Sequence, residues 1–199
     1  MEEILNSALL NSYSYQEYRK IVTDLLQDGK TSGAIQTEAL VNYSRLNETR
    51  MHRIDKTMRI DGAIISKLKS LQSQYIWLVI AEGWCGDAAQ LLPIFNKMST
   101  ISEHIDLKIV FRDENQDLMN LFLTNGNKSI PKLIILDKNS LGIISDWGPR
   151  PKGAVDLIQN YKEKFGVIDD TIKAELQMWY LHDKGLSTQK EIIELLKGS

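Results

Sequence analysis

The chain has 199 residues, 43% of them apolar and 25% charged, which is the composition of an ordinary globular protein. Its 24 basic and 26 acidic side chains give a net charge of −2, whereas a general nucleic-acid binder is usually basic. No stretch approaches the roughly 18 uninterrupted apolar residues that span a bilayer. The single cysteine excludes an internal disulfide framework, and the first residues lack the pattern of an export signal. We therefore expect a cytoplasmic protein with no nucleic-acid or membrane partner.

The chain up to about residue 70 has helical patterns. Ser14 and Glu17 form a capping box at the start of an apolar stripe that Gly29 ends. A second helix is predicted from about Thr37 to Met58. Its later part, residues 45–59, has five basic residues and two acidic ones, an excess of three positive charges: Arg45, Arg50, Arg53, Lys56 and Arg59 against Glu48 and Asp55. This segment either binds an anionic ligand or partner, or is a solvated helix face packed on the sheet.

After about residue 72, strands alternate with helices. We predict four strands, each a short run rich in β-forming residues, at Tyr75–Ala81, Ile105–Phe111, Lys132–Leu136 and Gly142–Trp147. Helices are predicted between and after them at 86–100, 116–124, 154–165 and 169–183, with a last helix capped by Ser187. A right-handed crossover makes the first two strands parallel, and the last two form a hairpin in the same sheet.

These elements predict an α/β fold, a three-layer α/β/α sandwich with a mixed central sheet and extra helices at both ends. No repeat or linker marks a boundary, so we predict a single domain over residues 1–199. Its core covers about residues 72–166. A helical N-terminal extension (1–71) precedes the core, and a helical C-terminal extension (167–199) follows it.

The only cysteine, Cys85, stands between the first strand and the helix that follows it. Unpaired backbone N–H groups and the helix dipole at this position stabilise an anion. We therefore expect the thiol to have a pKa below its ordinary value of about 8.5. Asp87 opposes this effect, because its carboxylate disfavours a neighbouring thiolate. The alternative is that Cys85 is an inert, buried thiol.

Three motifs around this cysteine resemble the thioredoxin family, over roughly residues 75–166. They stand where that family has the start of its redox motif, the proline of its active-site helix and the cis-proline facing the catalytic sulfur: Trp84-Cys85-Gly86, Pro93 and Ile130-Pro131. The strings EGWCGDA at 82–88 and WGPRP at 147–151 resemble a bacterial thioredoxin-like branch with helical extensions. The resemblance implies a thioredoxin-like fold with Cys85 as the catalytic residue. It also implies these substrate-binding residues: Trp84, Gly86, Asp87, Ala88, Ile130 and Pro131.

Sheet geometry independently brings Pro131 near the cysteine. If the strand after Pro131 lies antiparallel beside the cysteine strand, its start meets the end of that strand, and Pro131 faces Cys85. A cis bond there leaves the backbone of Ile130 able to pair with an extended peptide substrate. The alternative is a trans proline at the start of an edge strand.

The sequence departs from the family pattern at two positions. Ala88 replaces the second cysteine of the usual Cys-x-x-Cys motif, so an internal dithiol–disulfide cycle is impossible. Val79 replaces a buried acid, and Glu82 lies past that position. What remains is one-thiol chemistry, in which Cys85 forms a mixed disulfide or a sulfenic acid that an external thiol resolves.

We therefore predict a monothiol thiol–disulfide oxidoreductase that acts on a protein or small-molecule disulfide or thiol. The reaction requires no cofactor and admits a low-molecular-weight thiol as co-substrate. The alternative is a non-catalytic module of the thioredoxin fold that binds peptides or proteins. The loss of the second cysteine favours the module, whereas the retained Trp-Cys-Gly and Ile-Pro motifs favour the enzyme.

Two arginines are candidates for stabilising an anion at the site. Arg112 ends the strand parallel to the cysteine strand, and Arg150 follows the hairpin strand that returns to the same edge, so both are expected to flank the cysteine. Alternatively, each pairs with a surface acid such as Asp113 or Asp146. We expect no metal site, because the 3 histidines are scattered in the sequence.

Overall fold

The computed structural model describes residues 1–196 and contains the predicted mixed sheet flanked by helices. β1 (Tyr75–Ala81) is parallel to β2 (Ile105–Phe111) and antiparallel to β3 (Lys132–Asp137), which pairs in turn with β4 (Ile143–Trp147). The strand order is therefore β2–β1–β3–β4. Residues 197–199, the end of the predicted C-terminal extension, lie outside the described residues.

The helices lie at both ends of the chain and in the connections of the sheet: α1 (Glu2–Leu10), α2 (Tyr15–Gln27), α3 (Glu38–Thr57), α4 (Gly62–Lys69), α5 (Gly86–Ser99), α6 (Gln116–Leu121), α7 (Lys152–Phe165), α8 (Asp170–Asp183) and α9 (Leu186–Leu195). Ser14 and Glu17 form the predicted capping box of α2. The predicted cap of α9 is wrong, because Ser187 lies in its first turn, where its N–H donates to Asp183. Among residues 1–196, no helix has both the length and the apolar character needed to cross a membrane.

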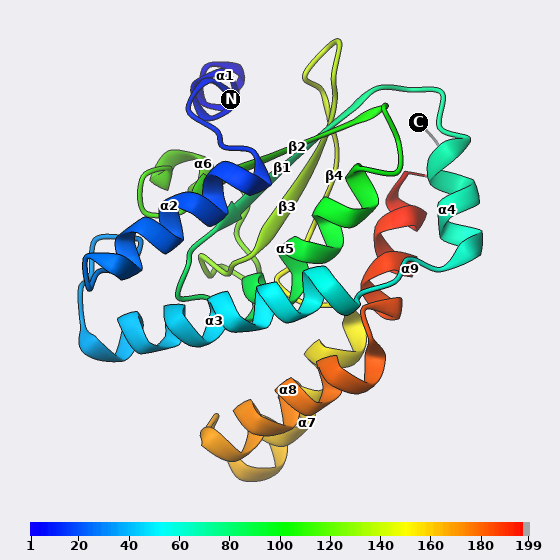
Figure 1. Cartoon of the computed structure of the whole chain (residues 1–199). Helices are drawn as coiled ribbons and strands as arrows, with labels where there is room; N and C mark the ends of the chain where they lie inside the picture. The colour runs from blue at the N-terminus through cyan, green and yellow to red at the C-terminus, as the bar shows by residue number, and fades with distance from the viewer. Residues whose placement is uncertain (197–199) are drawn as a thin grey trace.

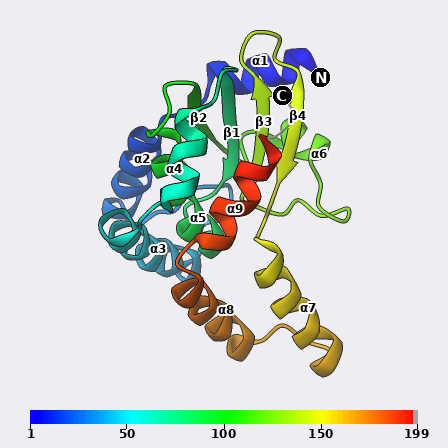
Figure 2. The same cartoon turned by 90° about the vertical axis from the view of Figure 1, so that its right-hand side faces the viewer.

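Helices cover both faces of the sheet (Figures 1 and 2). α5 and α9 lie on one face, α6 lies on the other, and α3 packs across the outside of α5. α7 and α8 pack together as a pair that projects beyond the edge at which β1, β2 and β4 end. Cys85 follows β1 at this same edge. Helices from both ends of the chain therefore approach the segment that contains the cysteine.

The helix that covers β4 is α9, which lies in the C-terminal extension beyond the predicted core of about residues 72–166. α7 buries only Ala154 completely, whereas α9 buries Ile192 and Ile193 and contacts both α5 and β4. Apolar spacing shows that a helix has a face to bury, but it does not show which element will cover that face. The C-terminal residues thus contribute directly to the main core.

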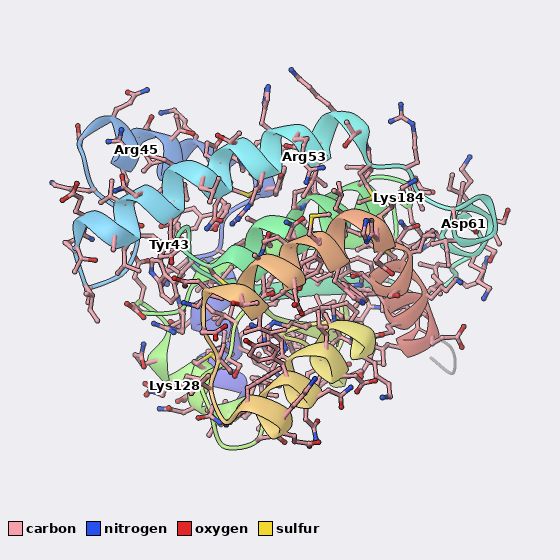
Figure 3. All side chains as sticks on the ribbon, turned by 90° about the horizontal axis from the view of Figure 1, so that it is seen from below. Tyr43, Arg45, Arg53, Asp61, Lys128 and Lys184 are labelled. Atoms are coloured by element: carbon pink, nitrogen blue, oxygen red, sulfur yellow. The ribbon has the colours of Figure 1, made fainter. Side chains whose placement is uncertain are left out.

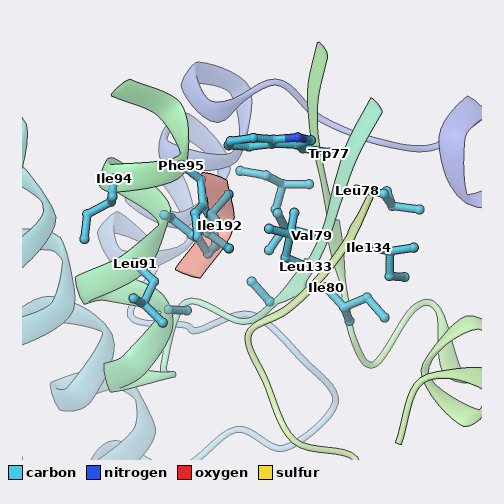
Figure 4. Packing of buried hydrophobic residues seen from close by; sticks show 14 of the residues in the cluster. Trp77, Leu78, Val79, Ile80, Leu91, Ile94, Phe95, Leu133, Ile134 and Ile192 are labelled. Carbon is cyan, nitrogen blue, oxygen red and sulfur yellow. The ribbon is translucent and has the colours of Figure 1, made fainter. Parts of the chain in front are cut away.

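The apolar core extends over both faces of β1 (Figure 4). Val79 and Leu133 point toward α5 and meet Phe95 there, while Ile80 and Ile134 point to the opposite face. All seven residues of β1 are buried, which explains why its sequence is a continuous apolar run rather than an alternating one. This rigid, fully covered strand carries the cysteine segment at its carboxyl end.

Gly148 follows β4 directly and packs against Pro131, in the loop that precedes β3. The peptide bonds Ile130–Pro131 and Gly148–Pro149 are both cis, and Gly148 has a φ of 121°, which side-chain-bearing residues rarely adopt. A Cβ atom at this position would collide with the carbonyl oxygen of Pro131. Only glycine therefore allows the segment after β4 to lie directly against the segment that faces Cys85.

We predict that Gly148→Ala lowers the free energy of unfolding by roughly 2–4 kcal/mol, because it adds backbone overlap to an unfavourable φ. Gly126→Ala is the matched control, since Gly126 also has a positive φ (77°) but has open space where the Cβ would lie. The control should lose only about 1–2 kcal/mol. Urea denaturation of the three proteins measures both values, and equal losses in the two variants would contradict the close packing at Pro131.

Candidate active site

The Cys85 sulfur lies between the start of α5 and the start of β3. Cys85 is the N-cap residue of α5, and its Sγ accepts a hydrogen bond from the N–H of Ala88 at 3.5 Å. The thiol donates to the carbonyl oxygen of Ile130 at 3.4 Å, next to the cis bond to Pro131. Two segments 45 residues apart in the chain therefore meet at the sulfur. Cys85 itself is only 8% exposed.

The thiol is protonated at neutral pH. Burial, together with the negative charge of Asp87, raises the pKa of the Cys85 thiol to about 12. The backbone N–H groups of Ala88 and Asp87 and the charge of Arg150 lower this pKa without offsetting the burial. The prediction that Cys85 has a pKa below its ordinary value is therefore wrong. The N-terminus of α5 stabilises the thiolate, but the loss of water around the buried sulfur destabilises it more.

Asp87 is the centre of a buried polar cluster beside the sulfur. The hydroxyl of Tyr180, from α8, donates to one carboxylate oxygen at 2.8 Å, and the guanidinium of Arg150 pairs with the other at 2.6 Å. Burial and the Asp87 charge hold the pKa of Tyr180 well above its ordinary value, so the hydroxyl remains a donor. The start of α5 is thereby fixed to both the C-terminal extension and the segment after β4.

The two predicted arginines have different partners. Arg150 pairs with Asp87 and lies close enough to Cys85 for its charge to lower the pKa of the thiol. Arg112 instead pairs with Asp113 at 2.9 Å, as the alternative interpretation had it, and lies 4.9 Å above the ring of Trp84. Arg112 thus orients the tryptophan of the motif, while Arg150 is the arginine that acts on the sulfur.

Glu82 is a buried acid that the sequence analysis did not assign to the site. Its carboxylate accepts hydrogen bonds from the hydroxyl of Ser32 and from the N–H of Asp113, at 3.0 Å for the latter. The Ser32 oxygen also accepts the N–H of Gly83 at 2.8 Å. Burial raises the pKa of Glu82 above its ordinary value, although these hydrogen bonds act in the opposite direction. The loop before α3 therefore holds the residues between β1 and Cys85.

Asn47 of α3 is a second residue that sequence reasoning missed. Its side-chain amide donates to the carbonyl of Gly83 at 3.0 Å, and its amide oxygen accepts a hydrogen bond from Arg50 at 2.9 Å. Asn47 and Ser44 occupy buried positions in the stripe that also contains Val41 and Met51. Polar residues at apolar spacing were the available signal, because a buried amide is expected to have a specific partner.

Within residues 1–196, no group of three or more His, Cys, Asp or Glu side chains is placed to hold a metal ion.

Residues 33–162 match the sequence model of a family described as thioredoxin, which is more than half of the chain. The chain belongs to the thioredoxin family. The match begins at Gly33, well before the Tyr75 at which the resemblance was placed, so it includes α3 and α4. In this thioredoxin-family chain, the helix that carries Asn47 is thus part of the family pattern rather than an addition to it.

Two solved structures share this arrangement of the thioredoxin-family chain over nearly its full length. A protein of unknown function from Pseudomonas aeruginosa has a TM-score of 0.59 at 15% identity, with 96% of this chain and 95% of that chain covered. An HIV epitope-scaffold has a TM-score of 0.53 at 19% identity, with coverages of 94% and 99%. At these identities the likeness concerns the fold alone. No curated protein matches the chain.

We predict that the Glu82→Gln variant becomes more stable relative to the wild type as the pH rises. A raised folded-state pKa means that the protonated carboxyl is favoured on folding. Protonation of Glu82 contributes fully to the free energy of unfolding below the pKa of about 4.3 that the carboxyl has in the unfolded chain. This contribution is lost as the pH rises through the higher pKa of the folded protein. Glutamine keeps the size of the side chain without titrating. Its amide oxygen can still accept the Asp113 N–H, whereas its NH2 group can only donate to the Ser32 oxygen.

Urea denaturation from pH 4.5 to 8 should therefore show the difference between Glu82→Gln and wild type growing with pH. Glu82→Ala is the control, because it leaves the Ser32 hydroxyl and the Asp113 N–H without this partner and should be destabilised at every pH. Parallel pH profiles for Glu82→Gln and wild type would show that the carboxyl does not titrate differently on folding.

We predict that Asp87→Asn lowers the pKa of Cys85. A drop of about one pKa unit raises the thiolate fraction at pH 8 about tenfold, and the lower nucleophilicity of that thiolate leaves alkylation about threefold faster. The substitution removes the negative charge nearest the sulfur and frees Arg150 to act on the thiolate. The measurement is the midpoint of the rate–pH profile, which separates a pKa change from local unfolding. Asp106→Asn, which affects only an exposed pair with Lys138, is the control and should leave the midpoint unchanged.

Proposed function

We propose that this thioredoxin-family chain is a monothiol thiol–disulfide oxidoreductase that uses Cys85 as its nucleophile. The observation that supports this function is the position of the sulfur, between the Ala88 N–H at the start of α5 and the Ile130 carbonyl beside the cis bond. The substrate-binding surface of the proposal consists of the residues around that sulfur: Trp84, Gly86, Asp87, Ala88, Ile130 and Pro131.

The proposed reaction is two successive exchanges. The Cys85 thiolate attacks one sulfur of a substrate disulfide, a bond forms between the two sulfurs, and the other substrate sulfur leaves as a thiolate that takes up the proton. An external thiolate then attacks the substrate sulfur of this mixed disulfide, and Cys85 is released. Ala88 carries no sulfur, so a second thiol on another molecule must supply this last step.

Burial makes this reaction slow rather than impossible. With a pKa of about 12, only about one thiol in 10⁵ is ionised at pH 7. A thiolate of high pKa is intrinsically more nucleophilic, with a Brønsted coefficient of about 0.4–0.5, which recovers roughly two of those five orders of magnitude. The rate should therefore rise with pH well beyond neutrality, without the plateau of an activated thiol.

The non-catalytic binding module is the second candidate function, and the burial of Cys85 is the observation that favours it. A cysteine that is only 8% exposed, with its thiol donating a hydrogen bond to Ile130, behaves as a packed polar group. In that function, the same surface would bind an extended peptide or a protein without forming a covalent bond. The two functions differ in whether a mixed disulfide forms at Cys85.

We predict that wild-type protein incubated at pH 9 with a small symmetric disulfide forms a mixed disulfide at Cys85, and that an added thiol removes it. Intact-mass spectrometry measures both steps, with Cys85→Ser as the unreactive control. Turnover of insulin without a second thiol should be poor, because product release needs an external sulfur.

Ala88→Cys provides a matched gain of function, since its N–H already lies 3.5 Å from the Cys85 sulfur. A second sulfur there should allow internal resolution and restore dithiol turnover. Absence of the mixed disulfide in the wild type, even at pH 9, would exclude the oxidoreductase and leave the binding module.

A further inference from the structure

A pocket of about 350 Å³ opens between α3 and α8, next to the cysteine motif. Trp84, Gly86 and Asp87, which flank Cys85 in the sequence, form one wall. Figure 3 shows α3 and α8 on either side of α5, with Tyr43 labelled near α3, and both helices contribute residues to the pocket. The volume is at the small end of the range for ligand sites, so the pocket suits a compact small molecule rather than a polypeptide.

Three basic side chains line this pocket, and their charges are not equally balanced. Arg150 pairs with Asp87, and Lys173 pairs with the exposed Asp170. Arg50 donates only to the neutral amide oxygen of Asn47 and has no carboxylate partner among residues 1–196. Its guanidinium is partly buried. Burial and the nearby charge of Arg53 lower its pKa, and the charge of Asp87, which Arg150 already pairs with, acts in the opposite direction without offsetting them. Arg50 is therefore a poorly compensated cation facing a pocket.

The acidic residues of the same helix do not neutralise Arg50. Glu48 and Asp55, the two acids of the positively charged segment 45–59, both pair with Arg19 of α2. The charge excess noted in the sequence is thus left to the basic side chains of α3. Of these, Arg50 lies nearest the cysteine motif, because its guanidinium nitrogen is 3.6 Å from where a Cβ on Gly86 would lie.

We propose that this pocket binds the carboxylate of a small anionic thiol, with Arg50 as the counter-ion. The bound molecule is the external thiol that resolves the mixed disulfide. This inference rests on the proposed function. The half-exposed ring of Tyr43 and the side chain of Trp84 supply contact area for the rest of the molecule. Gly86, the residue directly after Cys85, lies in the wall of the pocket, so the pocket adjoins the cysteine segment.

The step is an exchange that needs no further reagent. The bound thiol loses its proton to water, and its sulfur attacks the substrate sulfur attached to Cys85. A disulfide forms between those two sulfurs, the bond to Cys85 breaks, and Cys85 leaves as a thiolate that regains the proton. α3 and α8 would thereby hold the co-substrate whose sulfur replaces the one missing at Ala88.

The binding test uses S-methylglutathione, a thioether that carries carboxylates and cannot exchange. Calorimetric titration into Cys85→Ser protein should detect binding that weakens as salt is raised. In the Cys85→Ser background, the further substitution Arg50→Met should weaken the affinity for S-methylglutathione by about tenfold or more, which is about 1.4 kcal/mol. Arg50→Lys in the same background should retain part of the affinity. Arg45→Met, an exposed position on the same helix, is the control and should bind like the parent. Equal affinity in the Arg50→Met and parent proteins, or no binding, would overturn the inference.

A kinetic test separates this inference from the proposed function. In the wild-type background, Arg50→Met should raise the KM for glutathione in the resolving step and leave resolution by uncharged 2-mercaptoethanol unchanged. If Arg50→Met and the wild type exchange equally well with both thiols, the proposed thiol site in the pocket is wrong and the proposed oxidoreductase function stands. Binding of S-methylglutathione that depends on Arg50, without any exchange, overturns the oxidoreductase and supports the anion site.

Discussion

The Asp87 carboxylate accepts a hydrogen bond from Tyr180 and pairs with Arg150, so one buried charge joins the start of α5 to α8 and to the segment after β4. A buried carboxylate is tolerated only when its partners are in place, and this requirement fixes three distant parts of the chain relative to one another. The same charge lies close to Cys85 and raises the pKa of its thiol. The interaction that organises the site therefore also disfavours ionisation of the proposed nucleophile.

The N-terminal part of the chain supports the other side of the cysteine segment. Ser32 bonds to Glu82 and to the N–H of Gly83, and Asn47 bonds to the carbonyl of Gly83. The family match, which begins at Gly33, includes the helix that carries Asn47. The residues between β1 and α5 are thus held by hydrogen bonds to segments that precede the sheet in sequence, in addition to their own packing.

These contacts give a consistent account of the proposed chemistry. The sandwich supplies one sulfur at the start of a helix. Burial keeps this thiol protonated until high pH or the reaction removes its proton. The surrounding helices supply charge, both the Arg150 that favours the thiolate and the Arg50 that faces the neighbouring pocket. A single-cysteine site of this kind depends on a second molecule for turnover, and the pocket between α3 and α8 is where the inference places that molecule.

The sequence by itself determined the four strands, the parallel pairing of the first two and the hairpin of the last two, while the place of β3 beside β1 was only a condition of the prediction. Local features decide these: the continuous apolar run of β1, the capping box at Ser14, and a crossover connection that can turn only one way. It also brought Cys85 and Pro131 to one edge, because an antiparallel strand that starts there must meet the end of β1. Tertiary structure decided the rest. Neither the pairing of Asp87 with Tyr180 nor the burial of the sulfur leaves a local signal, since both depend on which helix covers the site. The N-terminus of α5 favours a thiolate, as the sequence indicated, but only the packed structure shows that desolvation outweighs it.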